Sequence, residues 1–252
     1  MLLPSIIDDG AQMSAPSTDV LRWGRERVRA GLWRGDHRVA FLAPLPDAPP
    51  PSADFLRRCL TTLAERGFTQ VVTTALTPLE QAGFLAAGFD VAERLHLLAI
   101  EIDGLPALPA DLDPVRLGWG RRAEVLDVDR SAFSSFWQFD EAGLGDAIRA
   151  TPRTRVRGVE APERTPPLVA YAICGRAGPR GFVQRLAVRP ECQERGLGRG
   201  LLLDGLHWMR RRGVRRAVVN TQLGNEVALN LYQQIGFRRE PAGLSVLSTG
   251  LT

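Results

Sequence analysis

Leu186-Ala187-Val188-Arg189-Pro190-Glu191-Cys192-Gln193-Glu194-Arg195-Gly196-Leu197-Gly198-Arg199-Gly200 is the stretch that decides the fold. It begins as an apolar strand, passes through a turn that holds two glycines, and leads into an amphipathic helix predicted over residues 197–212. Glycines in such a turn allow the backbone to adopt positive φ and to come close to a ligand. Free N–H groups at a helix start, together with the helix dipole, attract anions such as phosphates. The stretch therefore predicts a phosphate-binding turn, to which Arg195 and Arg199 add positive charge.

Two common phosphate-binding motifs are excluded by the residues present. A P-loop requires Gly-Lys-Ser/Thr, but the chain contains no lysine, so all 32 of its basic residues are arginines. A dinucleotide-binding G-x-G-x-x-G motif that starts at Gly196 would need a third glycine where Leu201 stands. The acidic residue expected about 20 residues further on is also missing, because Asn220 lies in that neighbourhood.

Strands and helices alternate on both sides of this turn, which predicts an α/β fold with a central mixed sheet flanked by helices. The strands predicted in the second half are 115–117, 154–159, 168–174, 182–188, 217–221 and 244–247. The helices predicted there are 121–133, 140–150, 197–212 and 226–235. In the first half we predict strands 38–42, 70–75 and 93–102 and helices 53–66 and 79–87.

The two halves repeat part of this order. Gly67 precedes a strand and a helix that closes at Gly88-Phe89, as Gly213 precedes a strand and a helix that closes at Gly236-Phe237. This repetition indicates a diverged internal duplication, the alternative being two unrelated αβ units. The predicted organisation is a disordered tail, a first unit, a proline-rich linker and a second domain, over residues 1–17, 18–102, 103–113 and 114–252.

Composition narrows the class of protein. The chain has 252 residues, and its charged fraction of 24% is ordinary for a globular protein. Its net charge of +4 is small for this length and argues against a nucleic-acid partner. Three widely spaced cysteines and three isolated histidines predict neither a disulfide framework nor a metal site. No apolar stretch is long enough to span a membrane, and the start lacks a basic secretory segment, so we expect a cytoplasmic protein.

Two motifs follow one another along the second half of the chain. Gln193, Gly196 and Gly198 match the pattern Q/R-x-x-G-x-G/A, and Asn225 and Tyr232 follow, closed by the Gly-Phe pair. In this respect residues 114–248 resemble the GNAT family of CoA-dependent N-acyltransferases. The resemblance implies a GNAT fold in a tandem arrangement, with a degenerate GNAT-like unit in the N-terminal half.

The resemblance also implies roles for individual residues. Backbone groups of Leu186, Ala187 and Val188 would pair with the pantetheine arm of acetyl-CoA as an added strand does. The turn residues expected to bind the co-substrate are Gln193, Glu194, Arg195, Gly196, Leu197, Gly198 and Arg199. Asn225 would bind the pantetheine, and Tyr232 would protonate or hydrogen-bond the departing CoA thiolate. A small-molecule or peptide amine would attack the thioester directly in a ternary complex, which gains from orientation and charge stabilisation.

Simpler interpretations stand beside these roles. Tyr232 has the position of a core aromatic residue on an amphipathic helix, and Asn225 has the position of a helix N-cap. A general base is missing from the expected strands, which offer Gln184 and Asn220, because an amide takes no proton at neutral pH. Three hypotheses remain open: a water chain to a distant acid such as Glu160 or Asp140, an amine that arrives neutral, or a CoA-binding regulatory or scaffold protein that has lost transfer.

The first half lacks the residues with which the second half is expected to bind CoA. Its counterpart of the glycine turn is the proline-rich stretch 44–51, and proline supplies no N–H donor. The counterpart of Tyr232 is Phe84, which has no hydroxyl group. We therefore expect an N-terminal pseudo-domain that packs on, or roofs, the active one.

Overall fold

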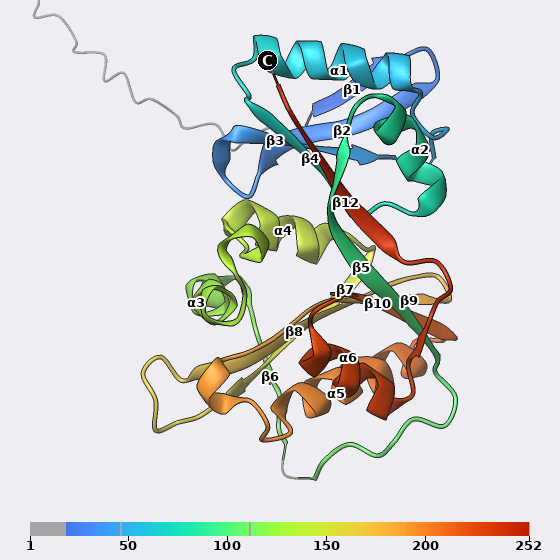
Figure 1. Cartoon of the computed structure of the whole chain (residues 1–252). Helices are drawn as coiled ribbons and strands as arrows, with labels where there is room; N and C mark the ends of the chain where they lie inside the picture. The colour runs from blue at the N-terminus through green and yellow to red at the C-terminus, as the bar shows by residue number, and fades with distance from the viewer. Residues whose placement is uncertain (1–18, 46, 111, 252) are drawn as a thin grey trace, which may run out of the picture.

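The structure is a computed structural model that describes residues 19–45, 47–110 and 112–251, so the predicted tail 1–17 lies outside the described residues. These residues form one mixed sheet with helices on its faces (Figure 1). The strands of the first half are β1 Asp19–Trp23, β2 Glu26–Trp33, β3 Asp36–Pro44, β4 Gln70–Thr73 and β5 Asp90–Glu101. Those of the second half are β6 Val115–Arg116, β7 Arg153–Glu160, β8 Leu168–Ala177, β9 Arg180–Val188, β10 Arg216–Gln222, β11 Arg238–Arg239 and β12 Leu244–Gly250. The α-helices are α1 Ala53–Glu65, α2 Pro78–Ala86, α3 Arg122–Ala132, α4 Glu141–Arg149, α5 Leu197–Arg211 and α6 Glu226–Ile235.

The strands and helices predicted from the sequence are present, with ends that shift by a few residues. The sequence did not predict the antiparallel hairpin of β1 and β2, although Val28 and Ala30 alternate with the exposed Arg29 as a half-buried strand requires. This alternation is confined to three positions of β2, so the apolar pattern is short. β1 is also the edge strand, where charged side chains discourage pairing with other chains.

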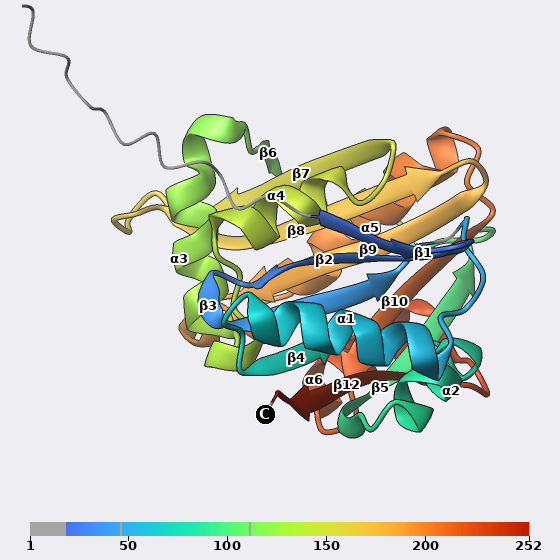
Figure 2. The ribbon, with the colours of Figure 1, turned by 90° about the horizontal axis from the view of Figure 1, so that it is seen from above.

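The two halves exchange their last strands. The order in the sheet is β1-β2-β3-β4-β12-β5-β10-β9-β8-β7-β6, and β11 pairs with β5. β5 follows α2 in the first half but pairs with β10 of the second, whereas β12 follows α6 but pairs with β4 of the first. β5 and β12 also pair with each other and lie side by side in Figures 1 and 2. The sheet is therefore continuous between the two halves, which residues 103–113 separate in sequence.

The halves share a local geometry at the end of their second helices. The N–H of Phe89 bonds the carbonyl of Phe84 at 3.1 Å, and the N–H of Phe237 bonds the carbonyl of Tyr232 at 3.0 Å. Each pair also packs ring against ring, with centroids 5.2 Å and 5.7 Å apart. Gly88 and Gly236 stand before the second aromatic residue with φ of 95° and 114°, values that favour glycine. This correspondence agrees with the duplication expected from the sequence.

Four apolar clusters fill the layers. α5 and α6 cover one face of the C-terminal part of the sheet, and α3 and α4 cover the other. α1 and α2 pack on one face of the N-terminal part, at the top of Figure 1. The opposite face of β4 and β12 meets the segment that joins α3 to α4, where Trp33 of β2 lies near Phe136, with ring centroids 5.6 Å apart. This last cluster brings the N-terminal half over the C-terminal half.

The exchange of strands generates a stability prediction. Leu247 of β12 is fully buried in the cluster under α1, so Leu247→Ala removes packing from the N-terminal core. We expect the free energy of unfolding to fall by about 2–5 kcal/mol, measured by chemical denaturation. Val227→Ala is the control, because Val227 is 68% exposed on α6. Equal, small effects of the two substitutions would contradict the placement of β12 in that core.

Candidate active site

Strands β9 and β10 separate after a short parallel ladder. The paired residues are Arg216 with Arg180, Ala217 with Gly181 and Val218 with Phe182. Beyond this point β9 continues to Val188 along β8, and β10 continues to Gln222 along β5. Within the described part of the chain, no strand pairs with the edge of β9 that faces β10 over residues 183–188. This edge leaves backbone groups available for an extended ligand.

A bulge in β9 lies at the point of separation. Ile173 of β8 is opposite Arg185 and Cys174 is opposite Val183, so Gln184 has no partner in the ladder. Both polar atoms of the Gln184 side-chain amide are buried without a hydrogen-bond partner among the described residues. Gln184 lines a cavity, so these atoms are available to a ligand that enters it.

The glycine turn follows the end of β9. Glu194 and Gly196 adopt positive φ, of 62° and 78°, and α5 begins at Leu197 with Gly196 as its N-cap. The first N–H groups of a helix have no intrahelical acceptor, so those of Leu197, Gly198 and Arg199 are available to an anion. A Cβ placed on Gly198 would come no nearer than 3.5 Å to Leu231 or Val188 side chains. The packing of the protein itself therefore does not require glycine at position 198.

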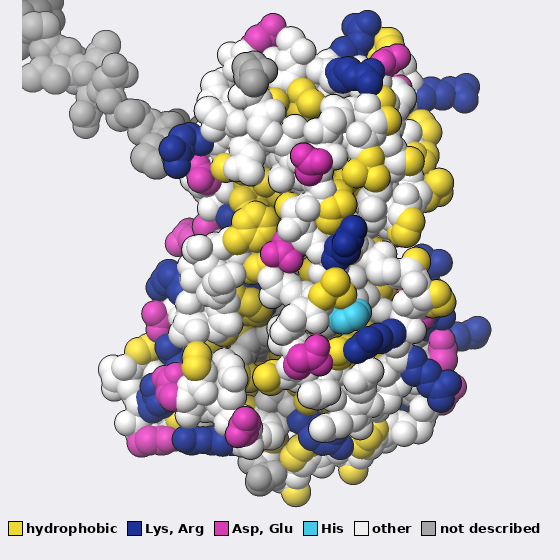
Figure 3. All heavy atoms as spheres, in the orientation of Figure 1, with side chains coloured by type: hydrophobic (Ala, Val, Ile, Leu, Met, Phe, Trp, Pro, Cys, Tyr) yellow, Lys and Arg dark blue, Asp and Glu magenta, His cyan; other side chains and the backbone are white. Residues whose placement is uncertain are grey.

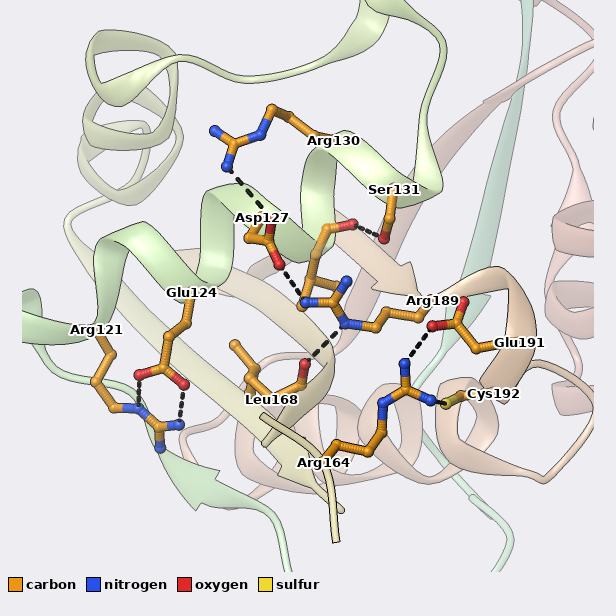
Figure 4. A network of polar contacts seen from close by, with 11 residues as sticks. Arg121, Glu124, Asp127, Arg130, Ser131, Arg164, Leu168, Arg189, Glu191 and Cys192 are labelled. Carbon is orange, nitrogen blue, oxygen red and sulfur yellow. Dashed lines mark hydrogen bonds and ion pairs between the residues drawn. The ribbon is translucent and has the colours of Figure 1, made fainter. Parts of the chain in front are cut away.

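A polar network anchors the segment that leads into this turn (Figure 4). The Arg189 guanidinium pairs with Asp127 of α3 and donates to the carbonyl of Leu168 at 3.1 Å. The hydrogen bond from Arg189, and then its charge, hold the pKa of the Asp127 carboxyl below its usual value. Arg164 pairs with Glu191 at 2.6 Å, just before the turn. These contacts tie the turn to α3 and to the loop between β7 and β8.

Helix α6 presents the two other predicted residues to the same cavity. Asn225 caps α6 by accepting the N–H of Ala228 at 3.1 Å, as the simpler interpretation predicts. Its Nδ2 has no acceptor among the described residues, and Asn225 lines the cavity. Tyr232 also lines the cavity, and burial raises the pKa of its phenol, so the hydroxyl keeps its proton at neutral pH. The simpler role and the ligand-binding role of each residue are thus compatible.

The cavity lies between the two halves and measures about 410 Å³. Its floor comes from β9, β10 and α6, one wall from α4, and its cover from the N-terminal half. Of the residues predicted to bind CoA, Leu186, Asn225 and Tyr232 line it. The turn residues 193–199 lie outside its lining, beyond the end of β9. Ala187 is buried toward α3, so its side chain belongs to the core.

A buried ion pair holds the cavity wall. Arg185 of β9 binds Asp129 of α3 through two bonds of 2.7 and 2.8 Å, and donates to the carbonyl of Trp137 at 2.6 Å. Asp129 is fully buried and also accepts from the hydroxyl of Tyr171 and from the N–H of Phe139, the latter at 2.7 Å. Both oxygens of Asp129 thus accept hydrogen bonds, as a buried carboxylate needs to be stable.

The carboxylates expected as distant acids have other partners. Glu160 pairs with Arg121, and Asp140 caps α4 by accepting the N–H of Gly143 at 2.7 Å. Neither lines the cavity. Asp146 of α4 is the one carboxylate among the described lining residues, and it pairs with Arg149 at 3.0 Å. Asn220, Thr221 and Gln222 of β10 line the cavity with polar groups that are not bases.

The sequence did not predict the cavity residues that the N-terminal half contributes. Trp33 and Arg34 enter the cavity from the hairpin of β2 and β3, together with Arg29 and Phe41. Arg34 donates to the carbonyl of Gln138 at 3.0 Å, across 104 residues of sequence. The signal available was local: Gly35 suits the second position of a tight two-residue hairpin turn, whereas the distant contact of Arg34 leaves no local pattern.

Some other kinds of site are not found in the part of the chain that the structure describes. It holds no helix of the length and hydropathy needed to cross a membrane. It likewise holds no group of three or more His, Cys, Asp or Glu side chains placed to bind a metal ion. On the face shown in Figure 3, charged side chains of both signs are interspersed.

Comparisons with known proteins agree with this geometry. A model of the acetyltransferase (GNAT) family matches residues 124–237. A mycothiol acetyltransferase from Thermomonospora curvata is 43% identical over 254 residues, covering 92% of this chain and 86% of that protein. The chain belongs to the GNAT family of acetyltransferases. The family and the N-acetyltransferase class expected from the sequence are thereby confirmed.

Other GNAT relatives match over different spans. A mycothiol acetyltransferase from Thermobispora bispora is 30% identical, covering 82% of this chain and 79% of that protein. The match to one from Rhodococcus jostii, at 36% identity, covers 40% of this chain and only 31% of that protein.

Solved GNAT structures share the fold. The tandem GNAT protein from the clavulanic acid biosynthesis pathway superposes with a TM-score of 0.68 at 15% identity, covering 92% of this chain and 82% of that one. A GCN5-related N-acetyltransferase from Kribbella flavida gives 0.58 at 16% identity, covering 92% and 89%. These matches confirm the predicted GNAT fold, a mixed sheet flanked by helices over both halves of the chain.

The buried pair behind the cavity generates a second stability prediction. Asp129→Asn leaves the Arg185 charge buried without its counter-charge, so we expect the free energy of unfolding to fall by about 3–5 kcal/mol. Chemical denaturation measures the change. Asp54→Asn is the matched control, because Asp54 pairs with Arg57 on the surface at 2.7 Å and should contribute little. Similar small effects of both substitutions would show that Asp129 does not hold this wall.

Proposed function

We propose that this GNAT protein transfers the acetyl group of acetyl-CoA to the primary amine of a small molecule, within a ternary complex. The observation that carries the proposal is the separation of β9 from β10 beside Tyr232. This gap offers an unpaired strand edge for the pantetheine at one side and a hydroxyl group for the thiolate at the other. The cavity beyond it gives the amine a place to approach the thioester.

The residues present fit acetyl-CoA. Leu186, Ala187 and Val188 would bond the pantetheine amides through the free edge of β9. Asn225 would add its free Nδ2 to the same arm. The pyrophosphate would lie against the turn, whose residues are Gln193, Glu194, Arg195, Gly196, Leu197, Gly198 and Arg199. Positive φ at Glu194 and Gly196 supports this assignment, because it turns successive N–H groups toward one side.

Tyr232 would act on the leaving group. Burial raises the pKa of its phenol, so the hydroxyl remains protonated over the pH range in which an amine is partly neutral. From that position it would donate a hydrogen bond or a proton to the sulfur as the C–S bond breaks. The attacking nitrogen forms the new C–N bond and loses one proton. Asp146 would accept that proton and release it to solvent, while an amine that arrives neutral needs no earlier deprotonation.

The acceptor is proposed by class. Relatives named mycothiol acetyltransferases make a mycothiol-related amine the first compound to test. Polar groups from Gln184, Asn220 and Gln222 line the cavity and suit a hydroxyl-rich or amide-rich molecule. The cytoplasmic location expected from the sequence remains a prediction.

The N-terminal half would shape the acceptor site without binding CoA. The start of α1 is the N-terminal counterpart of the start of α5, where the pyrophosphate of CoA would bind. Here the Glu26 carboxylate accepts a hydrogen bond from the backbone N–H of Ser52 and, at 3.0 Å, another from the Ser52 hydroxyl. Phe84 replaces the catalytic hydroxyl and is fully buried. We propose that this half is a degenerate GNAT unit whose sheet covers the cavity, as the hairpin at Trp33 indicates.

Calorimetric titration with acetyl-CoA tests the co-substrate site. We expect the wild type to bind one equivalent and Gly198→Val to bind none, because the added side chain would occupy space at the turn, beside Leu231 and Val188, that the co-substrate needs. Gly118→Val is the control, because nothing lies within 4 Å of a Cβ at that exposed position. Unchanged binding by Gly198→Val would refute the turn assignment. Binding by the wild type without transfer to any amine would favour the alternative, a CoA-binding regulatory protein.

Replacement of the hydroxyl tests the acid role. Tyr232→Phe should lower kcat roughly a hundredfold, because no group would protonate the thiolate, while the dissociation constant of acetyl-CoA changes little. Steady-state release of free CoA thiol measures kcat, and calorimetry measures binding. Parallel losses in both quantities would indicate that Tyr232 serves the binding of CoA instead.

A further inference from the structure

We propose that the amine acceptor carries a carboxylate and that Arg34 of the N-terminal half binds it. This inference rests on the proposed function and adds the chemistry by which the cavity selects its substrate. Arg34 lies in the turn between β2 and β3, and it is one of the residues that line the cavity.

The backbone at Arg34 is unusual. Arg34 and Gly35 both have positive φ, of 50° and 77°, as a two-residue hairpin turn requires. Asparagine, aspartate and glycine fill the first position of such turns at the least steric cost. An arginine here keeps a strained conformation, and strain of this kind concentrates at functional sites.

The guanidinium of Arg34 is fixed before any ligand binds. It lies 4.7 Å from the ring centroid of Trp33 and 5.4 Å from those of Trp137 and Phe139. Its Nη1 donates to the carbonyl of Gln138 at 3.0 Å. These contacts come from both halves of the chain, so the group has a defined place in the cavity. A donor held in this way loses little conformational entropy when it binds a ligand.

The donors of this side chain exceed the acceptors around it. A guanidinium has five N–H donors, and Arg34 uses one of them on a neutral carbonyl; it forms no ion pair with a described residue. The neighbouring Arg185 forms an ion pair with Asp129, and its guanidinium lies 4.0 Å from the centroid of the same Phe139 ring. Burial and the nearby charge of Arg185 lower the pKa of Arg34 to about 10.

A second unpaired donor lies on the same wall. The indole Nε1 of Trp137 is buried without an acceptor among the described residues, although Trp137 lines the cavity. Beyond the one bond from Arg34 to Gln138, the N–H groups of Arg34 and Trp137 have no acceptor among the described residues. A carboxylate supplies two acceptor oxygens in the fork geometry of a guanidinium, and it would form the direct ion pair that Asp129 and Asp140 do not form, although their charges act on Arg34.

The test compares acceptors that differ only in that charge. Dipeptides with a free amine are offered in matched pairs, one with a C-terminal carboxylate and one with a C-terminal amide, so that the reacting nitrogen is the same. For the wild type we expect kcat/KM to favour the carboxylate at least about tenfold, mainly through KM. In Arg34→Gln this preference should disappear, and Arg34→Lys should restore part of it because the charge returns without the fork.

The control is another arginine of the N-terminal half. Arg58 stacks on Trp23 at 4.3 Å, away from the cavity, so Arg58→Gln should keep the wild-type preference. A purely structural role of Arg34 would change stability and overall turnover while the ratio between carboxylate and amide stayed constant. Calorimetric titration of the same pairs into the CoA-bound protein gives the ratio without turnover.

The outcomes separate this inference from the proposed function. Acetylation of amines with no preference for the carboxylate, or a preference that survives in Arg34→Gln, overturns the role of Arg34 and leaves the transferase standing. Acetylation of neutral amines with no binding of any carboxylate dipeptide also overturns it. Binding of acetyl-CoA with no transfer to any amine overturns the proposed function, and carboxylate binding that depends on Arg34 would then remain as evidence for the site.

Discussion

The early end of the parallel ladder between β9 and β10 is the constraint on which the site depends. Three residue pairs join these strands, and each strand then follows a different neighbour. Because a strand edge without a partner has unused N–H and C=O groups, the gap is a natural place for an extended molecule. The bulge at Gln184 lies where the strands part, and the glycine turn lies at the far end of β9. The gap, the bulge and the turn thus follow one another along β9 and mark the proposed path of the co-substrate.

The walls of this path depend on contacts that are distant in sequence. Asp129 joins α3 to β8 and β9 through Tyr171 and Arg185, and Arg189 joins the end of β9 to the same helix. The exchange of β5 and β12 ties the N-terminal half to the C-terminal half through backbone pairing. The cavity between the halves is therefore a property of the whole chain rather than of the segment that carries the family motif.

Much of this architecture could be predicted from local sequence. The turn at Gly196, the helices with a buried face and the Gly-Phe ends are local patterns, and the structure has them where the sequence places them. The exchange of β5 and β12 could not be predicted, because the two strands have the same apolar pattern whichever β-neighbour they choose. The cavity wall could not be predicted either, because Arg34 and Trp137 belong to no sequence motif and only the packing of the two halves brings them together. Asp146 was overlooked because a single acid on a helix gives no signal of which face is buried.

A crystal structure of the complex with acetyl-CoA tests the central claim most directly. The account predicts pantetheine amides hydrogen-bonded to the edge of β9 between Val183 and Val188, with the pyrophosphate on the N–H groups that open α5 and the thioester sulfur within hydrogen-bonding distance of the Tyr232 hydroxyl. Density for the nucleotide at the proline-rich stretch before α1, or a β9 edge that stays free while CoA binds elsewhere, would contradict it.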